Sequence, residues 1–322
     1  AKQKKVAREL FTIDKKIELN RQTNQTLEQI AQAIFKSWFV DFEPTRAKIA
    51  ALEAGGSEDD ALLAAMQTIA GSALFAIDAA DADAQTQLSR LQTEHPEQYT
   101  TLRATAELFP SAMQESELGE IPEGWNVGTL ADFSDLNKNS WTVKTVPAEI
   151  DYVDLANTKN GVIESTTRYL SGNAPSRARR KLFNGDTIIG TVRPGNRSFA
   201  FIKQPSDSLT GSTGFAVLSP KSPEFAEYIY IAATSDEAIN HLAHLADGGA
   251  YPAVRSEVVA GITVIVPKSS VLMCFHEMVR PYFDISASLK TENKSLSELR
   301  DILLPKLLSG ELSLADLGSS DD

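Results

Sequence analysis

Two long stretches of this chain place apolar side chains at alternating steps of three and four residues, and this spacing restricts the fold more than any other feature. The steps run from Leu10 to Trp38 and from Phe275 to Leu303. Such steps give the 3.5-residue repeat that keeps one stripe of a helix against a partner helix. Both stretches span 28 residues, which makes each helix roughly 42 Å long. We therefore expect two helices of matched length that form a coiled coil.

A compact domain between the two helices decides their relative direction. The first helix leads into that domain and the second leaves from the same end, so we expect the pair to run antiparallel. The alternative is two unrelated amphipathic helices packed on one core, because isolated heptad patterns are common.

The predicted seam contains polar residues as well as apolar ones. Two of them are Asn20 and Asn24 in the first helix. A polar layer between the helices costs stability but fixes their register. The competing interpretation is that these two asparagines contact another protein. In the second helix Glu292 interrupts the apolar series. The predicted interface residues are Ile13, Ile17, Asn20, Asn24, Leu27, Ile34 and Trp38 in the first helix, and Ile285, Leu289, Leu296, Leu299 and Leu303 in the second.

The first helix ends in more aromatic residues than a two-helix seam needs. They are Phe35, Trp38, Phe39 and Phe42. Packing into the core of the middle domain is the simpler interpretation, and a docking surface for another protein is the alternative.

The composition changes twice between the helices. The Ala-rich stretch that follows the first helix predicts short helices and then a linker. From Asn126 onward, short runs such as 186–192 and 261–267 are typical of strands, whereas 223–246 is typical of a helix. The predicted fold class is α+β, with one mixed α/β domain flanked by two long helices in an antiparallel coiled coil. The predicted segments are 1–43, the first helix; 44–118, the acidic helical insert and linker; 119–268, the mixed domain; and 269–322, the second helix and tail.

The net charge of −12 hides an uneven distribution along the chain. Residues 46–125 carry four Lys and Arg against fourteen Asp and Glu, whereas residues 168–203 carry eight Lys and Arg against Asp186 alone. A local basic cluster of this kind is typical of nucleic-acid binding, and a solvated basic face is the alternative. The cluster consists of Arg168, Arg177, Arg179, Arg180, Lys181, Arg193, Arg197 and Lys203.

No catalytic or metal-binding pattern is recognisable in the sequence. It lacks the G-x-x-x-x-G-K-[ST] and G-x-G-x-x-G loops and the [ND]-P-P-[YF] pattern of an adenine methyltransferase. His241 and His244 lie one helical turn apart without a third ligand, and Cys274 is expected to be a buried structural thiol. No run approaches the roughly 18 apolar residues of a membrane span. We expect a cytoplasmic protein that is not an enzyme and that binds neither a metal nor a membrane.

Four segments, in this order, resemble one family. They are "IDKKIELNRQTNQTLEQIAQAIFKSWFVDFEPTRAK", "LFPSAMQESELGEIPEGW", "LFNGDTIIGTV" and "LLPKLLSGEL". Together they are similar to the specificity subunit of type I restriction-modification systems. A full-length subunit of that family has two target recognition domains separated by two long antiparallel helices, and each domain reads one half of a split DNA site. This chain resembles the second half of such a subunit or a natural half-length form, and we expect an excised or processed fragment.

The resemblance implies recognition of double-stranded DNA without catalysis. The subunit would dock methyltransferase subunits, and restriction subunits in the full complex, onto a chosen sequence. With this resemblance, the aromatic cluster at the end of the first helix would be a docking surface for a methyltransferase subunit if it does not pack into the core. S-adenosylmethionine and ATP would then belong to those partners, and self-association would supply a second recognition domain. The alternatives are the recognition part of a fused methyltransferase-nuclease and a coiled-coil scaffold that binds only protein.

Two turns and one dense run of cations are the predicted DNA contacts. The run "SRARRK" supplies Arg177, Arg179, Arg180 and Lys181, which as a flexible basic segment would contact mainly phosphates. In "TVRPGNRSF", Pro194 and Gly195 impose a turn after a strand. The predicted base-reading residues on this turn are Arg193, Asn196 and Arg197; Lys203 completes the basic cluster, and Tyr251 and Arg255 belong to a second turn in "GGAYPAVRSEV".

Overall fold

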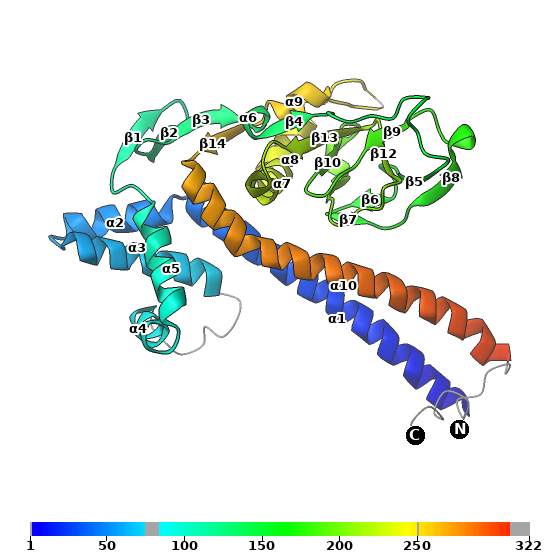
Figure 1. Ribbon diagram of the computed structural model, residues 1–322, viewed down its shortest axis with the longest axis horizontal. Coiled ribbons are helices and arrows are strands. Elements are labelled where there is room, and N and C mark those ends of the chain that lie inside the picture. The colour runs from blue at the N-terminus through cyan, green and yellow to red at the C-terminus, as the bar shows by residue number, and fades with distance from the viewer. Residues whose placement is uncertain (1, 75–83, 250, 310–322) are drawn as a thin grey trace. The chain divides into compact units, whose positions relative to one another are not determined.

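The computed structural model describes residues 2–74, 84–249 and 251–309 (Figure 1). By its internal contacts the chain divides into two compact units, one made of Ala1–Ile30 with Pro281–Asp322 and the other of Ala31–Arg280. Helix α1 (Lys2–Phe39) and helix α10 (Ser269–Ser309) each run through both units. None of the described helices is both long enough and apolar enough to cross a membrane.

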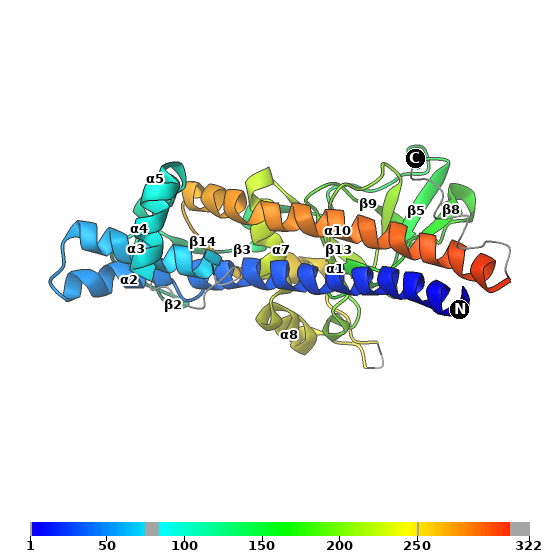
Figure 2. The same ribbon diagram turned by 90° about the horizontal axis from the view of Figure 1, so that it is seen from below.

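The first unit is a pair of antiparallel helices (Figures 1 and 2). Asp14 of α1 pairs with Arg300 of α10 at 3.1 Å, and Lys16 pairs with Glu292 at 3.5 Å. Later residues of α1 therefore contact earlier residues of α10. The two long helices run antiparallel, as the sequence predicts.

A buried polar layer explains why an asparagine lies in the seam. Asn20 is 2% exposed. Its Nδ2 donates to Oε2 of Glu292 at 2.7 Å and to Oδ1 of Asn293 at 2.9 Å. Asn293 in turn donates to the carbonyl oxygen of Ile17 at 3.4 Å. The polar interruption in the second helix thus lies opposite the polar interruption in the first.

The predicted seam of α10 is partly wrong. Ile285 and Leu299 are 47% and 44% exposed, so they do not lie against α1 in this unit. The partly buried positions are one residue further along the helix, at Ser286, Asn293 and Arg300. The hydrogen bonds of Asn293 and the ion pair of Arg300 hold α10 in this rotation. The spacing of apolar residues alone could not predict this rotation of α10. Leu289, Leu296 and Leu303 are half-buried, and they are compatible with the stripe through Ile285 and with the stripe through Ser286.

Replacing Asn20 with valine is expected to lower the free energy of unfolding of the helical pair by about 1–3 kcal/mol, because the buried Asn20 amide would lose its two hydrogen bonds to Glu292 and Asn293. Thermal and urea unfolding followed by circular dichroism at 222 nm measures this. The control is Asn24→Val four residues further on, where the amide oxygen is buried and has no hydrogen-bond partner among the described residues. Asn24→Val is expected to be neutral or stabilising, and equal losses in the two variants would contradict the account.

Within the second unit, the described residues of the acidic stretch form four helices, and short helices are what the sequence predicts there. Ser57 caps the second of them, because its Oγ accepts the Asp60 backbone N–H while the Asp60 carboxylate accepts the Ser57 N–H. Pro44 and Pro96 lie at the first turns of two others, where proline is tolerated. The four helices are α2 (Glu43–Glu53), α3 (Glu58–Leu74), α4 (Ala84–Glu94) and α5 (Pro96–Glu107).

The aromatic residues at the end of α1 and just after it are buried in the core of this unit. The Trp38 ring lies 5.1 Å from Phe109 and 5.9 Å from Phe275, and Phe39 lies 5.0 Å from Tyr228. Phe35 and Phe42 are also buried. Of the two interpretations left open by the sequence, core packing is therefore the one that this structure supports.

A buried lysine joins α2 to the segment after α5. Lys48 is 8% exposed, its Nζ donates to the carbonyl oxygen of Phe109 at 2.6 Å, and burial lowers its pKa. Lys48→Met keeps the volume but leaves that carbonyl without its donor, so a loss of about 1–3 kcal/mol in unfolding free energy is expected. Urea unfolding of the chain tests this. Arg46→Met on the exposed side of α2 is the control, and a similar loss there would argue against a special role for Lys48.

The rest of the second unit is rich in short strands. Its described residues form two four-stranded sheets and three smaller two-stranded pairs. The first sheet has the order β11 (Phe199–Phe201), β10 (Thr187–Gly190), β13 (Phe215–Pro220), β4 (Ser134–Leu136), with antiparallel neighbours. The second has the order β8 (Thr167–Leu170), β5 (Glu149–Val153), β12 (Leu209–Ser212), β9 (Ala178–Lys181), with β5 and β12 parallel. The smaller pairs are β1 (Met113–Ser116) with β2 (Gly119–Pro122), β3 (Asn126–Thr129) with β14 (Thr263–Val266), and β6 (Thr158–Lys159) with β7 (Val162–Ile163).

The segment 223–246, expected to be one helix, forms two. Ser235 separates them because its backbone is extended and its Oγ accepts the Ala238 N–H, which starts a new helix. The helices of this part are α6 (Leu130–Phe133), α7 (Ala226–Thr234), α8 (Asp236–Leu245) and α9 (Ser256–Ala260). The predicted α+β class is confirmed, and the break at Ser235 places the first turn of α8 beside the loop after β10.

Candidate nucleic-acid interface

The loop after β10 is held in a strained conformation. Arg193 and Arg197 have φ angles of 49° and 60° and flank a short 3-10 turn at Pro194–Asn196. A left-handed backbone at two non-glycine residues costs roughly 1–3 kcal/mol each and is common at functional sites. The Asn196 N–H bonds the Arg193 carbonyl at 2.8 Å, which closes the turn. The sequence predicts a turn at this place, and the structure confirms it.

A second loop, far away in the sequence, lies against the first. Its ends are joined by two hydrogen bonds between Asp247 and Ala253, and the Arg193 N–H donates to the carbonyl of Pro252 at 2.7 Å. Tyr251 on this loop is 71% exposed, and the Arg193 guanidinium carbon lies 4.9 Å from the centre of its ring. The two turns predicted separately from the sequence therefore form one surface. Figure 2 shows α8 and the neighbouring loops together on one side of the strand-rich part.

Arg197 lies in a network of its own. Its Nη1 pairs with Oδ1 of Asp236 at 2.7 Å, and its Nε donates to Oδ1 of Asn160 at 3.1 Å. Its guanidinium also lies 5.5 Å from the centre of the Phe199 ring. Sequence reasoning missed both partners. The Asn160-Gly161 dipeptide is a strong hairpin signal that could have been found, but nothing in the sequence places Asp236 beside Arg197.

A small hollow lies between this turn and α8. Its volume is about 290 Å³. Arg193 and Asn196 supply its polar side chains, and prolines, alanines and a glycine supply the rest; the lining residues are Arg193, Pro194, Gly195, Asn196, Ala243, Ala246 and Pro252. Hydrogen-bonding groups beside a small apolar depression suit the edge of a base better than a flat phosphate surface.

The dense run of cations is an ordered strand and not the flexible segment that was expected. Arg179, Arg180 and Lys181 belong to β9, which pairs with β12. Arg180 is half-buried, its Nη1 donates to Ser140 Oγ at 3.3 Å, and burial lowers its pKa. Lys181 Nζ lies 4.2 Å from the centre of the Trp141 ring. Hydrophobic and backbone contacts thus fix cations that the sequence suggested were mobile.

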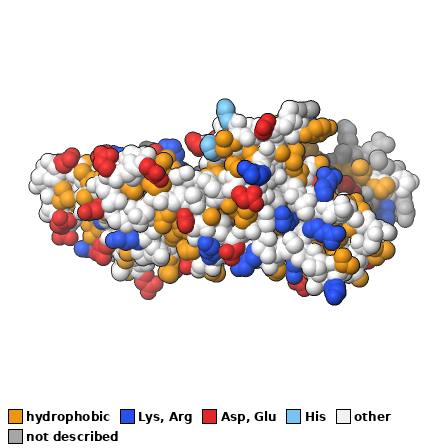
Figure 3. All heavy atoms as spheres, turned by 90° about the horizontal axis from the view of Figure 1, so that it is seen from above, with side chains coloured by type: hydrophobic (Ala, Val, Ile, Leu, Met, Phe, Trp, Pro, Cys, Tyr) orange, Lys and Arg blue, Asp and Glu red, His pale blue; other side chains and the backbone are white. Residues whose placement is uncertain are grey.

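The remaining predicted cations are spread over the domain. Arg177 is exposed beside β9, Lys203 is half-buried near the Phe201 ring, and Arg255 is exposed just before α9. Arg168 on β8 pairs with Asp151 at 3.0 Å, at the edge of the sheet opposite β9. Hydrogen bonds from Ser208 and Arg168 lower the pKa of Asp151. Figure 3 shows the Lys and Arg side chains of one face, which gather over the strand-rich part.

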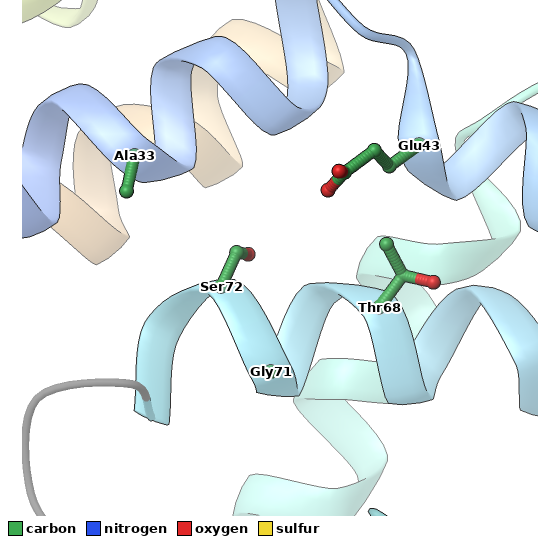
Figure 4. A pocket seen from close by; sticks show the side chains of 5 residues that line it. All are labelled: Ala33, Glu43, Thr68, Gly71 and Ser72. Carbon is green, nitrogen blue, oxygen red and sulfur yellow. The ribbon is translucent and has the colours of Figure 1, made fainter.

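Other candidate features do not form a chemical site. A larger hollow of about 510 Å³ in the second unit is lined by Ala33, Glu43, Thr68, Gly71 and Ser72 (Figure 4). Its one charged side chain gives no reason to assign a ligand. Across the described residues no three His, Cys, Asp or Glu side chains come together as a metal site. His244 Nδ1 contacts the carbonyl of Asn240, and Cys274 is half-buried with a raised pKa caused by burial.

Comparison with known proteins points to one family. No protein-family model matches the chain. The chain is 32% identical over 321 residues to the type I restriction enzyme HindI specificity subunit of Haemophilus influenzae, a match that covers 96% of this chain and 67% of that protein. It is 22% identical over 320 residues to the type I restriction enzyme MjaIX specificity subunit of Methanocaldococcus jannaschii, covering 98% of this chain and 60% of that protein. Among solved structures, the HsdS subunit of Thermoanaerobacter tengcongensis is 25% identical, with 59% of this chain and 47% of that chain covered and a TM-score of 0.41.

Proposed function

This chain belongs to the specificity subunits of type I restriction enzymes, and from this premise we propose that it reads one half of a bipartite DNA site and performs no catalysis itself. The observation that carries the proposal is the meeting of the two loops after β10 and α8, which brings Arg193, Asn196 and Tyr251 onto one surface. We assign the DNA-binding domain to residues 119–268.

The chemistry of the side chains favours base reading at these loops. An arginine fork fits O6 and N7 of guanine, and an asparagine amide fits N6 and N7 of adenine, both in the major groove. Tyr251 limits the freedom of Arg193 by lying against its guanidinium, and a side chain fixed before binding loses less entropy on forming its contacts. Strained backbone conformations are common at functional sites, so the left-handed conformations of Arg193 and Arg197 support a recognition role for this loop.

The ordered cations of β9 suit the DNA backbone. Arg177, Arg179 and Lys181 lie on or beside a strand and present charge at fixed places, which positions a duplex without reading its sequence. Arg180, with its half-buried side chain and its bond to Ser140, supports the strand. Lys203 and Arg255 are proposed as further phosphate contacts.

The chain spans only 67% and 60% of the two curated relatives. We infer that a second recognition domain comes from a longer form of the polypeptide or from a second copy. Methyltransferase subunits, and restriction subunits in the full complex, are the proposed partners, and the cytoplasm is the proposed compartment. The antiparallel helical pair would set the distance between half-sites.

Selection from a pool of randomised duplexes tests this function. The chain is mixed with its methyltransferase subunits, and bound DNA is sequenced at several salt concentrations. A short half-site or a paired site, with affinity that falls steeply as salt rises, is the expected result. Binding without any enriched sequence, both with and without the partner, would refute the proposal.

A further inference from the structure

The Arg197–Asp236 pair places an acidic side chain at the edge of the proposed DNA surface. Asp236 is the first residue of α8, and its side chain is 76% exposed, while that of Arg197 is 34% exposed. A carboxylate at such a place repels the phosphates of any duplex that approaches. A favourable contact between Asp236 and DNA would have to offset this repulsion.

The contacts of Arg197 leave part of its guanidinium for an outside acceptor. Its Nε donates to Asn160 and its Nη1 forms an ion pair with Asp236, and within the described residues Nη2 has no further partner. The Phe199 ring lies beside the guanidinium plane. Arg197 thus has a fixed orientation and donors that remain for DNA. Asp236 likewise uses Oδ1 for Arg197, so that Oδ2 can accept another bond.

The free donors of Arg197 and the free acceptor of Asp236 together match the major-groove edge of one kind of base pair. In the major groove a G·C pair presents the O6 and N7 acceptors of guanine beside the N4 amino donor of cytosine. Arginine is the usual donor to guanine, and aspartate is one of the side chains that accept from cytosine N4. An A·T pair in the same orientation places the adenine N6 amino group where Arg197 needs an acceptor, and it places thymine O4 where Asp236 needs a donor, so both contacts are unfavourable.

We propose that Asp236 is a specificity-determining residue that, together with Arg197, reads one G·C base pair and weakens binding to every other sequence. This inference rests on the proposed function, because it requires that the chain bind DNA through the loop after β10. Asp236 acts in two ways: it holds Arg197 in the reading orientation, and its charge disfavours base pairs that place an acceptor where the amino group of cytosine would lie.

A purely structural role is the competing explanation. An acidic residue in the first turn of a helix is stabilised by the helix dipole whatever lies nearby. Glu237 is the next residue of the same turn and is also exposed. Glu237→Gln therefore removes the same charge from the same helix end, and it is the matched control for Asp236→Asn.

The test measures the affinities of the wild-type chain, Asp236→Asn and Glu237→Gln for the selected duplex, for the same duplex with each G·C pair changed in turn, and for an unrelated duplex. For Asp236→Asn we expect discrimination at one G·C position to fall by about 5- to 150-fold, with tighter binding to the unrelated duplex. Asp236→Glu is expected to keep the low affinity for the unrelated duplex, and Glu237→Gln is expected to retain the wild-type discrimination.

Two results would overturn the inference. One is that Asp236→Asn weakens binding to all duplexes by the same factor, which indicates support of the loop only. The other is that Asp236→Asn and Glu237→Gln behave alike. In both cases the wild-type chain still selects a site and the proposed function stands. A wild-type chain that selects no sequence refutes the proposed function itself.

Discussion

Replacing Arg193 with alanine is expected to weaken binding to the target duplex by about 1–3 kcal/mol, the usual value of a bidentate arginine contact to guanine. The guanidinium lies over Tyr251, beside the hollow formed with Asn196. Its removal takes away both a base contact and the side chain that packs against the second loop. Because base contacts carry the sequence information, affinity for unrelated duplexes is expected to change far less. Equilibrium titration of labelled duplexes at constant salt measures both affinities.

Arg168→Ala is the matched control for Arg193→Ala. It removes the same charge from the same domain, but from the β8 edge, where Arg168 is paired with Asp151. We expect only a small loss that is equal for target and unrelated DNA. If Arg168→Ala lowered target affinity as much as Arg193→Ala, general charge and not the loop after β10 would account for binding.

Replacing Trp38 with alanine is expected to lower the free energy of unfolding of the second unit by about 3–5 kcal/mol. The side chain is fully buried and lies among Phe39, Phe109 and Phe275, so its loss leaves a large cavity between three segments of the chain. Urea unfolding followed by circular dichroism gives the value. Such a loss is a large part of the 5–15 kcal/mol stability of an ordinary domain, so a lowered yield of folded protein is also expected.

Trp38→Phe separates packing from hydrogen bonding. The Trp38 Nε1 is buried without a recorded partner among the described residues, so phenylalanine keeps an aromatic ring and removes an unsatisfied donor. We expect this variant to lose less than about 1.5 kcal/mol. If Trp38→Ala were as stable as the wild-type chain, the ring would not be part of the core that defines this unit.

Regular features of the fold could be predicted from the sequence. The repeat of three and four residues predicted the two long helices, and the turn residues around Pro194 predicted the loop after β10. Helices in the acidic stretch followed from alanine content. Each of these signals is local, because it depends on residues that are neighbours in the chain.

Other features depended on contacts between distant residues. The rotation of α10 is set by Asn20 with Asn293 and by Asp14 with Arg300, so the stripe through Ile285 and Leu299 could not be excluded beforehand. The cations of β9 looked flexible because their run is polar, yet pairing with β12 orders them.

Asp236 could not be recognised as a partner of Arg197 for the same reason. Their contact needs the end of α7 to place the first turn of α8 beside a loop nearly forty residues earlier in the chain. Local sequence signals therefore predicted the loop after β10 but not the Asp236 carboxylate that pairs with Arg197.

The most direct test of the central claim is the affinity of the wild-type chain for its selected duplex compared with duplexes that differ from it by one base pair, at physiological salt. Sequence reading by the loops after β10 and α8 predicts a loss of about 1–3 kcal/mol at each contacted position, and Arg193→Ala abolishes the loss at one of them. Equal affinity for all duplexes, falling together as salt rises, would show that the chain binds only the phosphate backbone and would contradict the account.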